Sequence, residues 1–418
     1  MMEKDPYSQV GVSARKEGVH QATKDLDKGI FPGAFCKVQP YIDENGQENT
    51  ELAEIFHADG IGTKVNVAYL ARREGYGPEI YRTIAYNALV MNTDDLLCNG
   101  VVNNIRVINY IAKNPNRISQ VDYEEIIKGY MDFIRIADAY GIKIYETGGE
   151  TADMGATTST LDMNVVAYAK IRRDQVIDAS KVPPESIIVG LASNGQSTYE
   201  DKPNSGLRSN GYSLAIPALL HPYYRKYPEV IDQAIDNSFR PHNLKTWKYI
   251  FDKKLFFTGP YKLEDMYDDI GTGERFTILE ALISPTRTYL PIIKACIEED
   301  VTIQGIIHNS GGGMTKSIGF GDGIRYVKQH LLLTPAIFHL IQGARDIEDK
   351  YMYQTFNMGT GMEIIVPNEE EAKKIIEIAE RFNVRAKVIG YTEKAKTNAN
   401  EVVIETRGKV LEYKKEKH

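Results

Sequence analysis

The segment that most constrains the fold of this chain runs from Phe56 to Lys64, where a carboxylate, two glycines, a hydroxyl and an ammonium stand close together. An apolar, strand-like segment precedes it, and a helix-like segment, 63–73, follows it. Gly60 and Gly62 allow positive φ and close approach to a bound group. Amide groups at a helix start, with Lys64 beside them, suit a phosphate. The segment predicts a strand–turn–helix unit. By itself it fits a phosphate-binding turn and an ordinary turn about equally, and the P-loop spacing is absent.

Carboxylates also gather at two other places in the first half of the chain. Asp94 and Asp95 lie near the end of a helical pattern over 81–97. Adjacent carboxylates repel each other and need solvent or a cation, so such a pair taken alone is more often a solvent-facing surface than a metal site. Gly148-Gly149-Glu150 follows a short strand-like segment. It predicts a ligand-facing corner, with a hairpin turn as the alternative.

Glycine-rich corners recur in the second half. Ser209-Asn210-Gly211 precedes a helical pattern over 212–220, which suits an anion at the helix start; Ser209 or Asn210 would equally serve as an N-cap. A strand-like segment, 301–307, is followed by His308, Ser310 and three glycines, for which close approach of a ligand or of backbone is the simplest reason. The last corner runs from Asn357 to Gly361.

The alternation of strand-like and helix-like segments predicts an α/β protein with two domains. Pro183-Pro184 marks the boundary, so we predict domains at 1–182 and 183–418. The polar segment 194–208 is long enough to be a lid or a substrate loop. Ser284 and Pro285 predict a helix start, with Ser284 as N-cap.

Composition excludes several classes of function. A net charge of −7 over 418 residues argues against a general nucleic-acid or membrane-surface binder. The three cysteines have neither disulfide nor zinc spacing, which favours a reducing compartment, and no segment has the length and apolarity of a signal peptide or membrane span. We therefore expect a cytoplasmic protein. Carboxylates and a lysine beside glycine loops predict an ATP-dependent enzyme that acts on a small phosphorylated metabolite.

The order of the motifs resembles that of the phosphoribosylformylglycinamidine cyclo-ligase (aminoimidazole ribonucleotide synthetase) family over about residues 7–405. The shared motifs are Asp59-Gly-Ile-Gly-Thr-Lys64, Asp95-Leu-Leu, Gly148-Gly-Glu-Thr-Ala-Asp153, Ser209-Asn-Gly-Tyr-Ser213, Ser284-Pro-Thr-Arg287, His308-Asn-Ser-Gly-Gly-Gly313 and Thr355-Phe-Asn-Met-Gly-Thr-Gly361. The first and third are common to a wider superfamily, whereas the later ones are more specific to the cyclo-ligase.

This resemblance implies a two-domain α/β (α+β) fold and a homodimer whose N-terminal sheets join in a barrel that binds ATP. It implies that ATP phosphorylates the formyl oxygen of the substrate in purine biosynthesis, that a nitrogen of the same molecule then attacks that carbon, and that ADP and phosphate are released. Ring closure within one molecule gains much of its rate from positioning, and the enzyme must neutralise the transferring phosphoryl group.

The resemblance also implies site residues, with ATP and Mg²⁺ as cofactors. The implied catalytic residues are Lys64, Asp95, Glu150 and Arg208. The implied ATP-binding residues are Asp59, Gly60, Gly62, Thr63, Lys64, Asp94, Gly148 and Gly149. The implied substrate-binding residues are Ser209, Asn210, Gly211, His308, Ser310, Gly311, Gly312 and Asn357. The implied metal ligands are Asp59, Asp95 and Glu150.

Two departures from the family pattern bear on single residues. Arg208 stands where the family commonly has histidine; an arginine binds phosphate well but is no general acid or base near neutral pH. Asp94 stands where the family has asparagine and adds a charge beside the predicted metal. Two alternatives stay open: another ATP-dependent kinase or phosphate-activating enzyme of the superfamily, and a non-catalytic nucleotide-binding relative. For selenophosphate synthetase, Cys36 is near the expected glycine loop but sits in a strand-like segment without a partner thiol.

Overall fold

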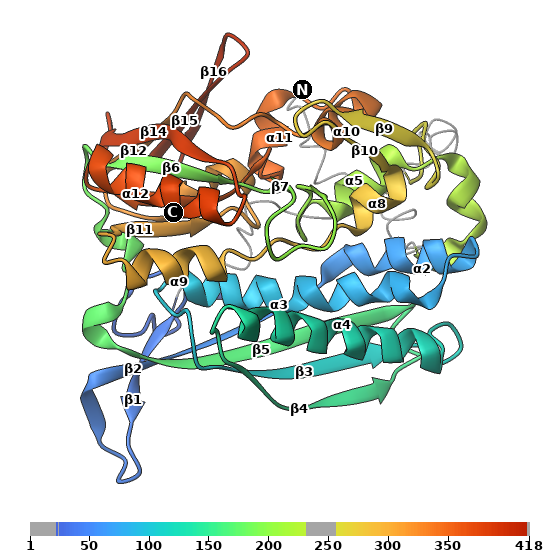
Figure 1. Cartoon of the computed structure of the whole chain (residues 1–418), viewed down its shortest axis with the longest axis horizontal. Helices are drawn as coiled ribbons and strands as arrows, with labels where there is room; N and C mark the ends of the chain where they lie inside the picture. The colour runs from blue at the N-terminus through green and yellow to red at the C-terminus, as the bar shows by residue number, and fades with distance from the viewer. Residues whose placement is uncertain (1–21, 24, 231–255, 416–418) are drawn as a thin grey trace.

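Two β-sheets organise the chain in a computed structural model that describes residues 22–23, 25–230 and 256–415 (Figure 1). The first sheet has the order β1-β2-β5-β3-β4, and only its β3–β4 pair is parallel. Its strands are β1 (Val38–Ile42), β2 (Glu48–Gly60), β3 (Ile105–Lys113), β4 (Ile144–Asp153) and β5 (Leu161–Arg172). The predicted α/β class with a sheet in each half is confirmed.

The second sheet has seven strands in the order β11-β13-β6-β14-β12-β15-β16. The strands are β6 (Ile187–Ala192), β11 (Gly305–His308), β12 (Ile324–Lys328), β13 (Thr360–Val366), β14 (Ala386–Lys394), β15 (Glu401–Thr406) and β16 (Lys409–Lys414). β13 and β14 both pair antiparallel with β6, so β6 lies between these two strands although they follow each other in the chain. We propose the division at residue 183 as the domain boundary; it falls between β5 and β6.

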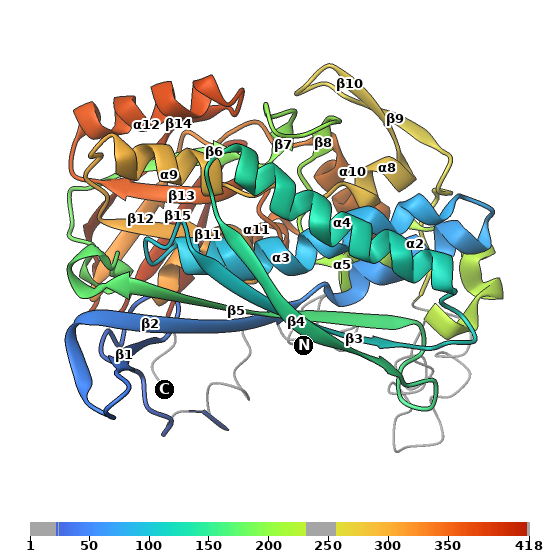
Figure 2. The same ribbon diagram turned by 60° about the horizontal axis from the view of Figure 1, so that its bottom comes forward.

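Helices cover one face of the first sheet, and among the described residues no helix covers the other face, which we call the open face (Figure 2). The helices of the first half are α2 (Val65–Arg73), α3 (Arg82–Leu97) and α4 (Gln120–Ala139). Helix α4 begins with a capping box made by Ser119 and Asp122. Along β5, residues alternate between buried and exposed, as expected for a strand with one covered face. The second half has helices α5 (Tyr212–Leu219), α8 (Ile278–Ile283), α9 (Leu290–Glu298), α10 (Ala336–Arg345), α11 (Asp349–Thr355) and α12 (Glu369–Arg381).

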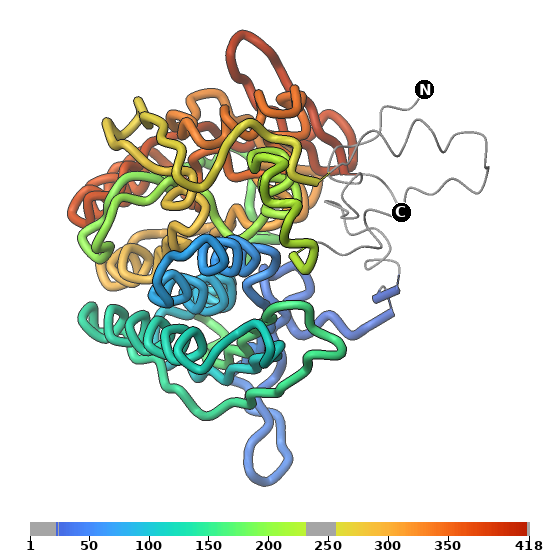
Figure 3. The backbone as a smooth tube through the Cα atoms, turned by 90° about the vertical axis from the view of Figure 1, so that its right-hand side faces the viewer, coloured from blue at the N-terminus to red at the C-terminus, as the bar shows by residue number. Residues whose placement is uncertain are grey.

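Helix α3 lies at the junction of the two halves, between the first sheet and the elements of the second half (Figures 1 and 3). Every residue from Asn87 to Leu97 is buried. The polar run that ends in Asp94 and Asp95 is therefore enclosed by protein, and the alternative of a solvent-facing surface is wrong. A polar group enclosed in this way needs a hydrogen-bond partner, so the partners of this run define the junction.

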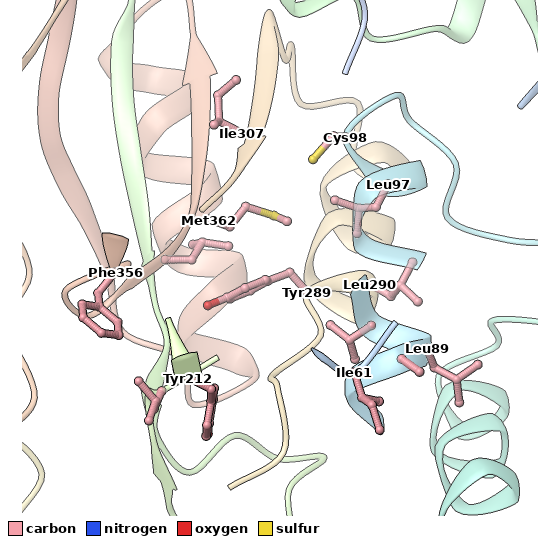
Figure 4. Packing of buried hydrophobic residues seen from close by; sticks show 14 of the residues in the cluster. Ile61, Leu89, Leu97, Cys98, Tyr212, Tyr289, Leu290, Ile307, Phe356 and Met362 are labelled. Carbon is pink, nitrogen blue, oxygen red and sulfur yellow. The ribbon is translucent and has the colours of Figure 1, made fainter. Parts of the chain in front are cut away.

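Apolar packing fixes this junction. Figure 4 shows Tyr289 pointing toward Met362 of β13, whereas the next residue, Leu290, lies beside Leu89 and Leu97 of α3. All five side chains are buried. Burying a side chain of this size contributes about 1.5–3 kcal/mol, so the start of α9 joins the helices of the first half to the second sheet.

Three predicted element boundaries are wrong. β2 continues through Asp59 to Gly60, so the turn begins at Ile61. β4 continues to Asp153, and Gly148, with φ of +119°, lies in an irregularity of its pairing with β3, so this segment is a bulged edge strand and neither a corner nor a hairpin turn. Helix α9 begins at Leu290, not at Ser284, because the intervening segment gives its hydrogen bonds to α3.

No helix of the described ranges is both long and apolar enough to cross a membrane. The polar start of the chain, which its sequence predicts to be irregular or marginally helical, lies outside the described residues up to residue 21, as do residues 416–418.

Candidate active site

A chain of hydrogen-bonded polar side chains crosses the junction of the two halves. His57 of β2 has its Nδ1 3.1 Å from Asn92 Oδ1 and its Nε2 3.3 Å from Asp95 Oδ2. The other Asp95 oxygen lies 2.5 Å from Nδ1 of His308, at the end of β11. Nε2 of His308 faces the guanidinium of Arg208. We call Asn92, His57, Asp95, His308 and Arg208 the polar chain.

The contacts of His308 fix its tautomer. A guanidinium only donates hydrogen bonds, so His308 Nε2 carries the lone pair and Nδ1 carries the proton that it donates to Asp95. Burial and the positive charge of Arg208 lower the pKa of His308 to about 4. Burial would raise the pKa of Asp95, but the hydrogen bond that His308 donates, together with the positive charge of Lys316, brings it below its ordinary value. Near neutral pH the pair is a carboxylate and a neutral imidazole.

A second group of polar side chains lies around Asn87 of α3. Its Oδ1 accepts hydrogen bonds from Lys64 Nζ at 3.1 Å, from Ser209 Oγ at 3.2 Å, and from both the backbone N–H, at 3.1 Å, and the hydroxyl of Thr286. Lys64 also donates to the carbonyl of Ser284. We call Lys64, Asn87, Ser209 and Thr286 the donor cluster. It joins the helices of the first half to α5 and to the segment before α9.

Two buried cations lie here without an anionic partner. Lys64 is fully buried and Arg208 is 2% exposed. Within the described ranges, neither has a carboxylate oxygen within 4.0 Å, and Arg208 Nε has no hydrogen-bond partner. Burial and the charge of Arg208 hold the pKa of Lys64 well below its ordinary value. Since a buried cation is costly without a counter-charge, the pair predicts an anionic ligand.

The start of α5 adds further donors to this region. Its N-cap is Gly211, with φ of +88° and no side-chain capping bond, so the predicted caps Ser209 and Asn210 are both wrong. A Cβ at Gly211 would lie 2.1 Å from the Phe356 ring, which restricts this position to glycine. Asn210 Nδ2 has no hydrogen-bond partner among the residues that the structure describes. An uncapped helix start beside unpartnered donors suits an anion.

Partly exposed residues surround the donor cluster. Gly62 is exposed, and a Cβ added to it would meet no atom within 4 Å. Thr63 Oγ1 lies 2.8 Å from Ser213 Oγ. A Cβ added to Gly311 would have Asn210 Oδ1 3.8 Å away as its nearest neighbour. The glycines of both motifs therefore leave space where a ligand would approach.

Some predicted site residues make structural contacts. Asp94 accepts from Thr288 Oγ1 at 2.7 Å and from the N–H of Tyr289 at 2.9 Å, and burial raises its pKa to about 7. Asn357 accepts from Ser193 Oγ and donates to the carbonyl of Gly206. These side chains already have partners, and they hold α9 and the loops around β6 in place.

A buried ion pair holds the loop 194–208, which the sequence predicts to be a lid or a substrate loop. The Arg287 guanidinium contacts both carboxylate oxygens of Glu200 and donates to the carbonyls of Ala192, Asn194 and Gly195. Arg287 is 2% exposed. Because all of its nitrogens are used within the protein, Arg287 anchors this loop.

The predicted metal ligands are not brought together within one chain. Glu150 is exposed on edge strand β4, with β3 and β5 between it and Asp59 on β2. Both oxygens of Asp95 face histidines. Across the described part of the chain, no three His, Cys, Asp or Glu side chains are grouped to hold a metal ion. Gly148 and Gly149 lie on β4 with Glu150, also away from the polar chain.

Sequence reasoning missed several side chains at the site. The sequence patterns predict a turn that contains His57 but no site role for this residue. They also predict no site role for Asn87 and Thr286. Lys316 Nζ lies 3.4 Å from Ser310 Oγ, and its charge helps to lower the pKa values of His308 and Asp95. Polar residues inside an otherwise apolar helix were the available signal for Asn87. Cys36 and Cys98 are both buried, and the negative charge of Asp95 raises the pKa of each thiol further than burial alone does.

Two family models match the chain. The N-terminal domain of AIR synthase related protein matches residues 45–171, and the C-terminal domain matches residues 280–402. Phosphoribosylformylglycinamidine cyclo-ligase of Methanocaldococcus jannaschii is 28% identical over 366 residues, which cover 87% of this chain and 84% of that protein. The protein of the same name from Acetivibrio thermocellus is 27% identical over 390 residues, covering 91% and 94%.

Solved structures share the fold at low identity. Phosphoribosylformylglycinamidine synthase II of Thermotoga maritima superposes with a TM-score of 0.52 at 12% identity over 98% of this chain; the match spans half of that longer chain. A chain of the HypE–HypF complex superposes with a TM-score of 0.50 at 11% identity, covering 94% of this chain and 98% of the other.

Proposed function

Because this chain belongs to the AIR synthase-related superfamily of ATP-dependent enzymes, we propose that it closes the imidazole ring of 5-aminoimidazole ribonucleotide. The substrate would be 5′-phosphoribosylformylglycinamidine, and ATP would yield ADP and phosphate. Relatives that carry the cyclo-ligase name match nearly the whole chain, which supports this choice. The observation that carries the proposal is the pair of buried cations, Lys64 and Arg208, for which the described residues supply no carboxylate within 4.0 Å.

The proposed chemistry assigns these cations to the phosphoryl group. ATP transfers its γ-phosphoryl group to the formyl oxygen, which converts a poor leaving group into phosphate. Lys64 and Arg208 would neutralise the charge of the transferring group, and they would do so strongly because they are shielded from water. Ser209, Asn210 and the start of α5 would hold a phosphate of the substrate.

The polar chain would handle the proton released in ring closure. The attacking nitrogen forms a bond to the formyl-derived carbon and loses a proton, and phosphate departs with the electrons of the broken C–O bond. His308 Nε2 has the lone pair to accept that proton once Arg208 turns toward the phosphoryl group. Asp95 holds the ring from the opposite nitrogen and would stabilise the imidazolium that forms.

Mg²⁺ would enter with the nucleotide. Magnesium is commonly bound by one or two carboxylates together with phosphate oxygens, and Asp59 and Asp95 are the proposed protein contacts. The described residues of one chain do not form a larger metal site.

The open face of the first sheet supports the proposal of a homodimer. Its exposed apolar side chains include Phe56, Ile108, Tyr110 and Val166, and Ile108 pairs directly with Val166. An exposed apolar surface of this kind marks an interaction site. A second copy of the sheet would cover it.

A turnover assay tests the function. Purified protein receives Mg-ATP and formylglycinamidine ribonucleotide, and ADP and aminoimidazole ribonucleotide are measured together. Equal formation of both products is expected. ADP without aminoimidazole would instead identify a kinase or phosphate-activating enzyme with another acceptor. Binding of ATP without turnover would identify a non-catalytic relative.

A further inference from the structure

The donor cluster has more hydrogen-bond donors than its acceptor can use. Lys64, Ser209 and Thr286 direct four donors at Asn87 Oδ1, which has two lone pairs. The orientation of the Asn87 amide is fixed, because its Nδ2 donates to the carbonyl of Thr83 at 2.8 Å. The atom that receives these donors is therefore a neutral oxygen.

A neutral oxygen leaves the charge of this region uncompensated. Among the described residues, the Lys64 ammonium otherwise contacts only the carbonyl of Ser284 and the face of the Tyr212 ring. Nearby, Arg208 Nε and Asn210 Nδ2 have no partner in the part of the chain that the structure describes. A phosphoryl group carries negative charge on several oxygens, so it would accept from these donors with charge-assisted bonds.

The cluster lies next to partly exposed residues. Lys64 follows exposed Gly62 and partly exposed Thr63, and Ser209 precedes partly exposed Asn210. The hydroxyls of Ser209 and Thr286 are 3.1 Å apart. A ligand could therefore approach the cluster from the side of Gly62 and Asn210.

We propose that Asn87 is an internal stand-in for a phosphoryl oxygen. In the absence of ligand, its Oδ1 receives the donors of Lys64, Ser209 and Thr286; when a phosphoryl group binds, these donors turn to that group. This inference rests on the proposed function, because it concerns the phosphoryl site of the same reaction. It adds Asn87 and Thr286 to that site.

The sharpest test is Asn87→Asp, which replaces the amide by a carboxylate of the same shape. The carboxylate would hold the donors permanently, so the affinity for inorganic phosphate, measured by isothermal titration calorimetry on the full chain, should fall at least about tenfold. The thermal unfolding midpoint should stay equal or rise. Asn103→Asp is the matched control: Asn103 Oδ1 accepts two backbone N–H groups, from Asn104 and Lys143, and phosphate binding should not change.

Thr286→Val decides the question if Asn87→Asp does not fold. Loss of one donor to a charged group should weaken phosphate binding about tenfold or more, while the backbone N–H of residue 286 remains. Wild-type affinity in either folded variant, or a wild-type protein that does not bind phosphate, would overturn the inference.

These outcomes are separate from the test of the proposed function, because phosphate binding needs no turnover. A protein that closes the ring while Asn87→Asp binds phosphate normally would refute only the inference. A protein that binds phosphate through the donor cluster without closing the ring would refute only the proposed reaction.

Discussion

Arg208 is the residue whose chemistry departs most from the motif in which it stands. Its guanidinium is buried between His308, the carbonyl of Arg287 and the ring of Tyr289, where it can stabilise negative charge but cannot accept a proton. Gly361 makes this setting possible, since a Cβ there would lie 2.9 Å from the guanidinium and 2.0 Å from the Tyr289 hydroxyl. In the proposed reaction, Arg208 supplies the positive charge that stabilises the phosphoryl group, and His308 supplies the lone pair that accepts the proton.

Arg208→Gln should lower kcat about 100-fold, because it removes a preorganised charge from the transferring group while keeping a donor near His308. Arg208→Lys should recover part of that loss, since it restores the charge without the planar fork. Steady-state measurement of ADP and aminoimidazole ribonucleotide checks both variants. Arg172→Gln, at an exposed surface ion pair, is the control. Equal rates for wild type and Arg208→Gln would contradict the assigned role.

His308 should make stability depend on pH. Its pKa is about 4 in the folded protein, against an ordinary value of 6.5, so the unfolded state binds more protons between these values. The free energy of unfolding is therefore highest above about pH 6.5, where His308 is neutral in both states. It decreases as the pH falls toward 4, by up to about 3 kcal/mol. Urea unfolding at pH 7.5 and 5.0 measures this decrease. The free energies of unfolding at the two pH values should differ less in His308→Gln than in wild type. An unchanged difference would exclude His308 as its source.

At the scale of elements, the segment 284–289 shows how tertiary contacts override a local signal. Ser284-Pro285 predicts a helix start, yet Thr286 and Tyr289 donate to Asn87 and Asp94 of α3, and the helix begins only at Leu290. The loop 194–208 is a parallel case. Its length suggests a lid, but Arg287 anchors it through Glu200 and three carbonyls.

Glu200→Gln should destabilise the protein by about 3–5 kcal/mol, because it leaves a buried guanidinium without its counter-charge. Glu298→Gln provides the matched control, since it removes an exposed ion pair with Lys294 and should cost less than about 1 kcal/mol. Chemical unfolding of both variants measures the difference. Similar losses in the two variants would show that the buried pair does not anchor the loop.

Across the whole molecule, α3 and α4 cover one face of the first sheet, and no helix in the described ranges covers the open face (Figure 2). We expect a second copy to cover the open face. Val166→Lys, at the centre of this face, should shift the protein from dimer to monomer in sedimentation velocity, because a charge cannot be buried there without a partner. Val410→Lys, at an exposed valine on β16 of the second sheet, should leave the assembly unchanged. A wild-type monomer, or a Val166→Lys dimer, would contradict this arrangement.

Most of the elements and the residue types of the site follow from local signals in the sequence. The patterns over 63–73, 81–97 and 212–220 predict helices, and the structure has α2, α3 and α5 there. These signals are local, because a helix or a cap depends on residues within a few positions of one another. The order of the glycine motifs likewise identifies the superfamily to which the chain belongs.

Which of these residues meet depends on how the chain folds in three dimensions. His57, Asp95, His308 and Arg208 come from four separate segments, and Asn87 receives donors from three. Glu150, in contrast, stands on an edge strand away from the polar chain. Contacts of this kind depend on sheet order and on the burial of α3 between the two halves. No spacing along the chain encodes them, because the free energy of enclosing a charge depends on the groups that surround it in space.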